Sequence, residues 1–225
     1  MSKEATKDAL LAAARSEFAA HGIAGARVDR IAERAGVNKE RIYGYFGSKE
    51  KLFDRVMEVV LDEMAEVVAM PGDDPVEYVG RIHDFYLAHP ELIRLMTWES
   101  LHYREDALEG QHERIARCAA KAESLAAGLG REPSPDVART MMTLIGLAAW
   151  PMVMPRLGRI VVGEEFGGEE GHLRMREHLV DFVRAALGRD ADGGTAENST
   201  GSTDGSTGNA GSAGNAEESG DGDAR

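Results

Sequence analysis

The chain has 225 residues, with 26 Lys or Arg against 39 Asp or Glu, and its formal net charge is −13 at pH 7. The single cysteine, Cys118, excludes an internal disulfide, and no uncharged stretch reaches the roughly 20 apolar residues of a membrane-spanning helix. This charge argues against nucleic-acid binding over the whole surface. Residues 1–55, however, hold 11 basic and 8 acidic side chains, so a polyanionic partner would meet this segment. We expect a cytoplasmic protein with no membrane partner and no cofactor.

The apolar pattern predicts an all-α protein. Over residues 1–188 apolar side chains recur at steps of three and four, while strand signals are almost absent. Residues 189–225 are Gly, Ser, Thr, Asn and acidic residues with a net charge of −6, a composition that cannot bury enough apolar surface to fold. We therefore predict an N-terminal domain at 1–55, a larger helical domain at 56–188 and a disordered acidic tail at 189–225.

Four helices are predicted at the N-terminus. The first ends at Gly22, the second at Gly36, the third runs from its cap Asn38 to about Phe46, and the fourth runs from its cap Ser48 over about residues 48–69. The second and third helices are short and are joined by Ala-Gly-Val. They form a helix-turn-helix pattern, whose second helix can enter a DNA major groove. The fourth helix would link the two domains.

The third helix has a buried side and a projecting side. Ile42 and Phe46 share one side, on which we expect both to be buried. Glu40, Arg41 and Gly44 project on the other. We predict that Arg41 contacts a base edge, assisted by Lys39 or Glu40, and that Gly44 lets the backbone approach the bases closely.

Two tyrosines flank the projecting side of this helix. Tyr43 and Tyr45 lie on either side of Gly44, where each phenol hydroxyl can donate to a phosphate oxygen. Lys49 adds a positive charge in the first turn of the fourth helix, whose N-terminus already favours phosphate. The alternative is that both tyrosines are half-buried core residues and that the charged residues form a solvated face.

The residues of this region resemble those of a known family. The spacing of Ile31-Ala32, Ala35-Gly36-Val37, Tyr43, Tyr45-Phe46, Ser48-Lys49-Glu50 and Leu52-Phe53 closely resembles the N-terminal domain of the TetR family of bacterial transcription regulators. The resemblance covers roughly residues 6–55. It implies phosphate contacts at Arg27, Tyr43, Tyr45 and Lys49 and base contacts at Lys39, Glu40 and Arg41. The family often has Thr at the position of Arg27 and a small residue at that of Glu40, so the operator sequence cannot be inherited.

The resemblance also implies a ligand cavity in the larger domain. Its helices are predicted at about 75–88, 91–103, 107–128, 135–149 and 169–187, with a Gly-rich joint at 163–171. Aromatic and thioether side chains that could line a pocket for an apolar ligand are Phe85, Tyr86, Met96, Trp98, His102, Tyr103, Met141 and Met142. The alternative is that they are ordinary core residues. The histidines show neither an i, i+4 pair nor an HExxH motif, so no metal site is expected, and Cys118 is expected to be a buried helical residue.

The last two helices suggest how two copies of the chain would associate. Their apolar stripes include Ile145, Ala148, Met175, Leu179 and Phe182, which the resemblance places in a four-helix dimer interface. They could instead close the core of one subunit. A helix-turn-helix protein needs a second copy to bind a palindromic operator.

The sequence therefore predicts a sequence-specific DNA-binding transcription regulator, a ligand-responsive repressor acting as a homodimer on double-stranded DNA with a palindromic operator. Two alternatives are an architectural protein that binds DNA without sequence preference and an all-α enzyme that uses the C-terminal cavity. An enzyme is not expected, because no nucleophile–base–orienter trio, phosphate loop or metal spacing is found.

Overall fold

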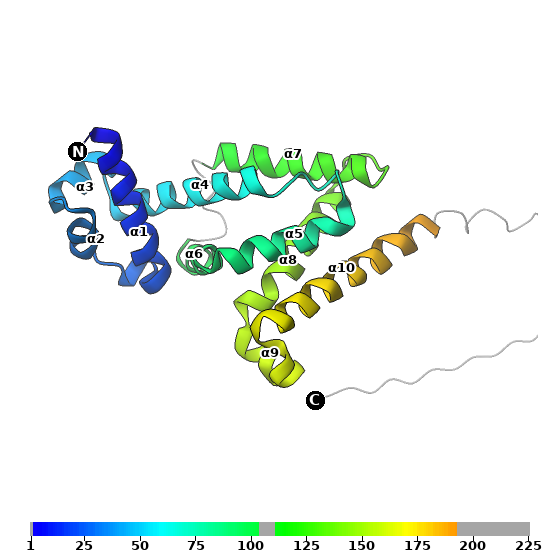
Figure 1. Cartoon of the computed structure of the whole chain (residues 1–225). Helices are drawn as coiled ribbons and strands as arrows, with labels where there is room; N and C mark the ends of the chain where they lie inside the picture. Colours follow the sequence, from blue (N-terminus) through cyan, green and yellow to red (C-terminus); the bar gives the residue numbers. More distant parts are fainter. Residues whose placement is uncertain (1, 104–110, 193–225) are drawn as a thin grey trace, which may run out of the picture.

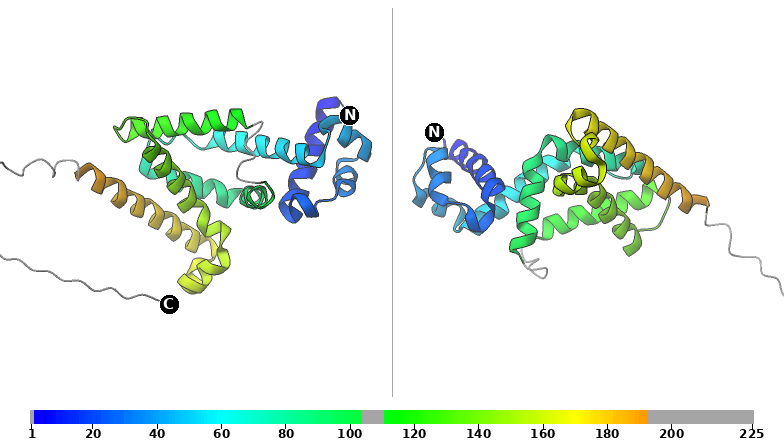
Figure 2. Two further views of the ribbon diagram at one scale, coloured as in Figure 1. Left: turned by 180° about the vertical axis from the view of Figure 1, so that it is seen from behind. Right: turned by 90° about the horizontal axis from the view of Figure 1, so that it is seen from below.

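The computed structural model describes residues 2–103 and 111–192, and over these residues it contains α-helices and one short 3-10 helix but no β-strand. The helices form two lobes, with α1–α3 at one end of the molecule and α5–α10 at the other (Figures 1 and 2). Helix α4 runs from the first lobe into the second. The elements are α1 (Lys3–Gly25), α2 (Val28–Ala35), α3 (Lys39–Phe46), α4 (Lys49–Val67), α5 (Pro75–Ala88), α6 (Pro90–His102), α7 (His112–Gly128), α8 (Pro135–Val153), α9 (Pro155–Val162), η1 (Gly163–Phe166) and α10 (Gly168–Asp192). The all-α prediction is confirmed.

Local capping signals set the helix boundaries of the first lobe as the sequence predicts. The side chain of Asn38 accepts a hydrogen bond from the backbone N–H of Arg41 at 3.1 Å, and that of Ser48 accepts one from Lys51 at 3.1 Å. Gly36 ends α2 in the left-handed conformation, with φ of 66°. Each of these devices acts within one turn of helix, which is why the sequence alone is enough to locate them.

The C-terminal part of the chain departs from the predicted helices. Helix α8 continues through Pro151 to Val153, because a proline in the last turn removes only one backbone donor and the N–H of Met154 still donates to Trp150 at 3.0 Å. A further helix, α9, and η1 occupy residues 155–166, where no helix was predicted. Helix α10 extends to Asp192, so the start of the tail was predicted too early, at residue 189. Residues 193–225 of the predicted tail lie outside the described residues.

A buried carboxylate joins α1 to the N-terminus of α2. Glu17 is fully buried and accepts hydrogen bonds from the backbone N–H of Arg27 at 2.9 Å and from the guanidinium of Arg30 at 2.8 and 2.6 Å. Burial raises the pKa of Glu17, but the bonds from Arg27 and Arg30 outweigh this effect and leave the pKa below its ordinary value. The negative charge also lies at the positive end of the α2 dipole. Glu17 therefore fixes the angle between α1 and the helix-turn-helix unit.

Helix α1 also connects the two lobes. Arg15 donates to Glu63 of α4 at 2.7 Å and to Glu91 of α6 at 2.5 Å. One helical turn further on than Glu17, α1 kinks at Gly22, whose φ of 67° and ψ of 177° are accessible essentially only to glycine. The indole of Trp98 from α6 covers this kink, since a Cβ on Gly22 would lie 2.7 Å from its ring atoms. The position of the first lobe is thus set by contacts of α1 with α4 and α6.

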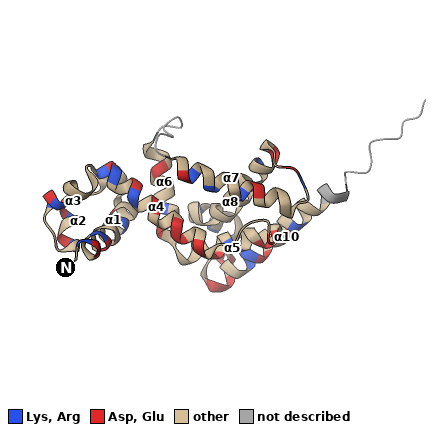
Figure 3. Ribbon diagram, turned by 90° about the horizontal axis from the view of Figure 1, so that it is seen from above, with Lys and Arg blue, Asp and Glu red and all other residues tan. Residues whose placement is uncertain are grey.

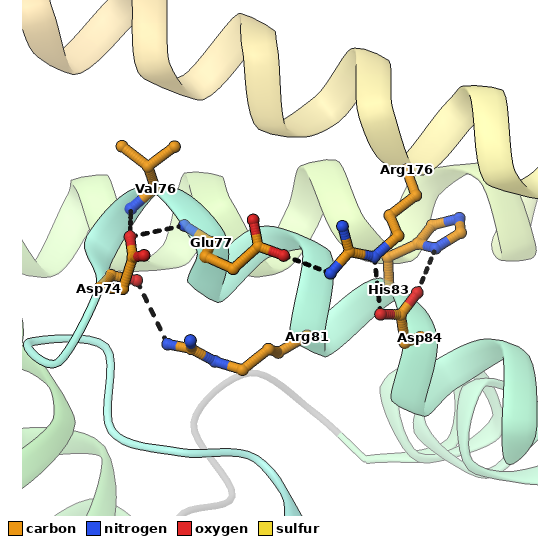
Figure 4. A network of polar contacts seen from close by, with 7 residues as sticks. All are labelled: Asp74, Val76, Glu77, Arg81, His83, Asp84 and Arg176. Carbon is orange, nitrogen blue, oxygen red and sulfur yellow. Dashed lines mark hydrogen bonds and ion pairs between the residues drawn. The ribbon is translucent and has the colours of Figure 1, made fainter.

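In the second lobe, a network of charged groups holds α10 against α5 (Figure 4). Arg176 of α10 donates to Asp84 at 2.7 Å and also pairs with Glu77, both on α5. His83 is fully buried beside this network, and burial lowers its pKa despite the neighbouring Asp84 carboxylate. Helices α5, α8 and α10 pack together in this part of the lobe (Figure 1).

None of the described helices is by itself long and apolar enough to cross a membrane. Only Pro135–Val153 and Pro155–Phe166 taken together meet those criteria of length and composition, and they are bent by 84° relative to each other.

We expect Gly22→Ala to destabilise the protein by at least about 1–3 kcal/mol, because alanine cannot adopt this backbone conformation without strain and its Cβ would clash with Trp98. The measurement is the free energy of unfolding in urea. The control is Gly44→Ala, because a Cβ at Gly44 has no neighbour within 4 Å and the residue is helical. Equal stabilities of the two variants would contradict the role given to Gly22.

We expect Glu17→Gln to destabilise the protein by about 1–3 kcal/mol near neutral pH, because it removes the charge from a buried, hydrogen-bonded acceptor. Since the pKa of Glu17 is lowered in the folded state, its stabilisation is present above the ordinary value of 4.5 and is lost as pH falls through the folded pKa. The stability difference between wild type and variant should therefore shrink below pH 4.5. Urea unfolding at several pH values measures it, with Glu33→Gln at an exposed site as the control. A difference independent of pH would refute this account.

Candidate functional site

The projecting side of α3 is exposed, as the sequence predicts. Ile42 is fully buried beneath it, while Lys39, Glu40, Arg41 and Gly44 face solvent. Of the residues that the structure describes, none forms an ion pair with the guanidinium of Arg41. A ligand could therefore pair with this charge without first displacing a carboxylate, and the backbone at Gly44 is open to close approach.

The residues predicted to lie beside this face differ in how exposed they are. Tyr43 is 42% exposed, whereas Tyr45 is half-buried with its ring 6.2 Å from that of Phe46. Phe46 is itself only half-buried, contrary to prediction, because α3 ends there at the rim of the lobe. Arg27 is exposed at the start of α2, and Lys49 donates to the carbonyl of Ala24 at 3.4 Å. The assignment of these residues as phosphate contacts stays a prediction.

An ion pair holds the start of α3 against α2. Lys39 lies 3.0 Å from Asp29, and the hydrogen bond and charge of Asp29 raise the pKa of Lys39. The ammonium group of Lys39 therefore has a partner in the unbound protein, whereas the described residues give Arg41 none. Basic and acidic residues alternate along this lobe (Figure 3), so its local positive charge depends on which side chains project.

The second lobe contains a cavity of about 150 Å³ between α4, α5, α6, α7 and α8. Three of the residues predicted for a pocket line it, namely Tyr86, Met96 and Met141. The others lie elsewhere: Phe85 packs against His89, Trp98 covers Gly22, His102 is exposed, the hydroxyl of Tyr103 donates to Asp54 at 2.7 Å, and Met142 is 75% exposed. Successive residues on a helix point about 100° apart, so neighbours such as Met141 and Met142 face different surroundings.

Helix α7 contributes a polar stripe to the cavity that sequence reasoning missed. Arg114, Arg117, Cys118 and Lys121 all line it, at the spacing that places residues on one side of a helix. Cys118 is exposed and not buried in the core, contrary to prediction. The other lining residues are Leu61, Met64, Ala65, Tyr78 and Ile145. The i, i+3, i+4, i+7 spacing was visible in the sequence, but a stripe of charge usually indicates a solvated face.

Polar groups at this cavity are only partly satisfied. Arg114 pairs with Glu99 at 2.6 Å and Arg117 pairs with Asp62, but Lys121 has no ion-pair partner among the described residues. Burial lowers the pKa of Lys121. The hydroxyl of Tyr78 is buried without a hydrogen-bond partner in the described part of the chain, and burial raises its pKa to about 12.

A second, open groove lies on the outer surface of α8, α9 and α10. It has a volume of about 500 Å³ and an apolar lining that includes Trp150, Met154, Leu157, Val161 and Val162. Two of the residues predicted for a dimer interface, Met175 and Leu179, line this groove, and Phe182 is 54% exposed on the same helix. Ile145 instead lines the internal cavity, and Ala148 is fully buried. Neither of these two side chains lines the groove.

Comparison with known proteins matches both lobes. A model described as bacterial regulatory proteins of the tetR family matches residues 10–56, and one described as a tetracyclin repressor-like C-terminal domain matches residues 74–185. The HTH-type transcriptional repressor SCO4008 of Streptomyces coelicolor is 38% identical over 192 residues, covering 83% of this chain and 97% of its own. The HTH-type transcriptional repressor NicS of Pseudomonas putida is 35% identical over 116 residues, covering 48% of this chain and 55% of its own.

Among solved structures, that of SCO4942 from Streptomyces coelicolor has a TM-score of 0.67 and 32% identity, and the match covers 80% of this chain and 97% of that one. The helix-turn-helix lobe, the helical second lobe and the near full-length matches to SCO4008 and SCO4942 lead to one conclusion. The chain belongs to the TetR family of bacterial regulatory proteins.

Proposed function

We propose that the protein is a cytoplasmic DNA-binding transcriptional repressor that binds a palindromic operator as a homodimer and is released when a ligand enters the cavity of the second lobe. The observation that carries the proposal is the exposed face of α3, where the guanidinium of Arg41 has no ion-pair partner among the described residues and lies close in the helix to the open backbone of Gly44. Membership of a family of regulatory proteins, with repressors among its relatives, supports it. The division into residues 1–55 for DNA and 56–188 for ligand and partner is part of this proposal.

The proposed base-reading residues are Lys39, Glu40, Arg41 and Gly44, on the exposed face of α3. Arg41 can donate two hydrogen bonds to one guanine, whereas Glu40 can accept from cytosine. The proposed phosphate contacts are Arg27, Tyr43, Tyr45 and Lys49, which lie around that face and carry no sequence information themselves. To contact DNA, Lys39 would have to give up its ion pair with Asp29. The loss of that ion pair would reduce the net binding energy that Lys39 contributes.

A homodimer is proposed through the groove on α8, α9 and α10. Ile160 and Val161 of α9 are 71% and 74% exposed, and Trp150 of α8 and Phe182 of α10 are each 54% exposed. A contiguous apolar surface of this kind marks an interaction site. A second copy buries it by twofold symmetry, and the same symmetry presents two α3 helices to two half-sites.

The cavity and the first lobe share the same two helices, which suggests how a ligand alters DNA binding. Met64 of α4 lines the cavity, and its neighbour Glu63 binds Arg15 of α1. Met96 of α6 also lines the cavity, and two residues later Trp98 covers Gly22 of α1. A ligand that moves α4 or α6 must therefore disturb a contact with α1. In a dimer this changes the separation of the two DNA-binding lobes.

A nonspecific architectural role is less consistent with the charge distribution. Residues 1–55 carry +3, whereas the whole chain carries −13, so the second lobe and tail repel DNA. Attraction is confined to the helix-turn-helix lobe, whereas a protein that binds DNA without sequence preference is expected to have a net basic body.

Selection of bound duplexes from a random DNA pool tests the proposal. We expect the wild-type protein to recover an inverted repeat and to sediment as a dimer. Val161→Glu, which places a charge in the apolar groove, should sediment as a monomer and lose preference for the repeat over a single half-site. Ile115→Glu is the matched control, because Ile115 is 48% exposed on α7 away from the groove. Recovery of no motif by the wild type would refute sequence-specific binding.

We expect Arg41→Ala to cost about 1–3 kcal/mol on the selected operator and to relax the preference at one base step, because a bidentate contact is lost. Lys49→Ala should weaken all sequences alike and reduce the salt dependence, because it removes a phosphate contact. Anisotropy titrations of the operator and its single-base variants at fixed salt measure both. Unchanged base preference in Arg41→Ala would show that another residue reads the operator.

A further inference from the structure

The polar stripe on α7 gives the cavity one charged end. Arg114, Arg117 and Lys121 come from successive turns of the same side of the helix, and bands of basic residues run along α7 (Figure 3). Among the described residues that line the cavity there is no carboxylate. A cationic ligand would thus find no carboxylate among these lining residues, and it would meet the ammonium group of Lys121.

Lys121 is the basic group of this stripe that remains available to a ligand. Arg114 and Arg117 are engaged by Glu99 and Asp62, which hold the N-terminal half of α7 over the cavity. The other end of α7 is held by a hydrogen bond and by packing: the N–H of Gly72 donates to the hydroxyl of Ser124 at 3.0 Å, and Leu125 is fully buried. Lys121 lies between these attachments and is partly buried, and the described part of the chain supplies no carboxylate to it.

A hydrogen-bond donor accompanies this charge. Tyr78 lines the same cavity, and its hydroxyl is fully buried with no partner among the described residues. Tyr78, Cys118 and Lys121 all line this one cavity, so a single small ligand can contact them together. Buried polar groups are normally hydrogen-bonded, so a hydroxyl without a partner among the described residues, in a cavity that is also lined by an ammonium group, marks a position for an acceptor.

The rest of the cavity fits one small apolar ring. Met64, Met96, Met141 and Ile145 line it, together with Tyr86. Thioethers adapt their shape and make favourable contacts with aromatic rings. The volume of about 150 Å³ matches an engineered apolar cavity of known size that binds benzene. The space is too small for the large apolar ligands that fill most binding pockets.

We propose that the cavity binds a monocyclic aromatic carboxylate, with its carboxylate accepting hydrogen bonds from Lys121 and the Tyr78 hydroxyl and its ring packed among the three methionines. This inference rests on the proposed function, in which the cavity holds the regulatory ligand. The sequence predicts an apolar ligand, whereas we propose an anionic one. The charge of the ligand completes an ion pair that the protein leaves open.

The test compares three planar compounds of nearly the same size but different charge. Benzoate, benzamide and benzamidine are titrated into the full-length protein by isothermal calorimetry near neutral pH, where they carry a negative, no and a positive charge. Benzoate should bind about tenfold or more tightly than benzamide, as expected for a hydrogen-bonded charge pair, and benzamidine should bind most weakly.

Two variants assign the effect to its residues. Lys121→Met keeps the length of the side chain and removes its charge, so benzoate should lose about ten- to a hundredfold in affinity while benzamide changes little. Tyr78→Phe keeps the ring and removes the hydroxyl, and should weaken benzoate several-fold. Lys3→Met, at an exposed site in α1, is the matched control and should change neither. Thermal unfolding of each variant establishes that it is folded, and Lys121→Gln serves if Lys121→Met is not.

The outcomes separate this inference from the proposed function. Equal or tighter binding of benzamide or benzamidine, no binding of any of the three compounds, or undiminished benzoate binding by folded Lys121→Met would each overturn the inference. The DNA-pool selection is performed without ligand, so recovery of an inverted repeat together with any of these results would leave the DNA-binding proposal intact.

Discussion

The packing of α1 against α4 and α6 is the constraint on which the rest of the arrangement depends. Buried apolar side chains run from the first lobe into the second, and the edge-to-face pair of Phe18 and Phe53, whose ring centroids are 5.2 Å apart, lies among them. The position of the first lobe relative to the second is set by the packing of α1 along α4 and α6, to which the double ion pair of Arg15 and the contact of Trp98 with Gly22 belong. Because α1 packs against both helices, a shift of α4 or α6 changes the position of the first lobe.

The electrostatic design of the two lobes differs in a way that follows from their surroundings. In the first lobe one oxygen of the buried carboxylate Glu17, Oε1, accepts hydrogen bonds from three donor atoms, and these bonds stabilise a fixed angle between helices, while Oε2 is buried without a hydrogen-bond partner among the described residues. In the second lobe Tyr78 is buried and Lys121 is partly buried, and neither has such a partner within residues 2–103 and 111–192. Unsatisfied groups cost stability, which is why they mark a place where an external molecule can supply what the fold omits.

The sequence predicted the features that depend on local chemistry. Asn38, Ser48 and Gly36 end or begin helices by contacts within one turn, and the burial of Ile42 follows from helical periodicity. Features that depend on packing between distant helices were not predictable in this way. Trp98 is directed to α1 and Cys118 to the cavity because of how α6 and α7 lie in the fold. The pattern of each helix fixes which residues share a side but not what that side faces.

Helix α9 shows the same limit for whole elements. It has eight residues, and none of them is buried in the single chain. A helix is usually predicted from an apolar stripe that faces the core of its own subunit, and α9 has no such stripe. Its apolar residues, including Ile160 and Val161, face outward beside α8 and α10. A short helix with an exposed apolar side is stable only if something covers that side. The presence of α9 therefore supports the proposed dimer, because a second copy would cover the apolar side that α9 leaves exposed in one subunit.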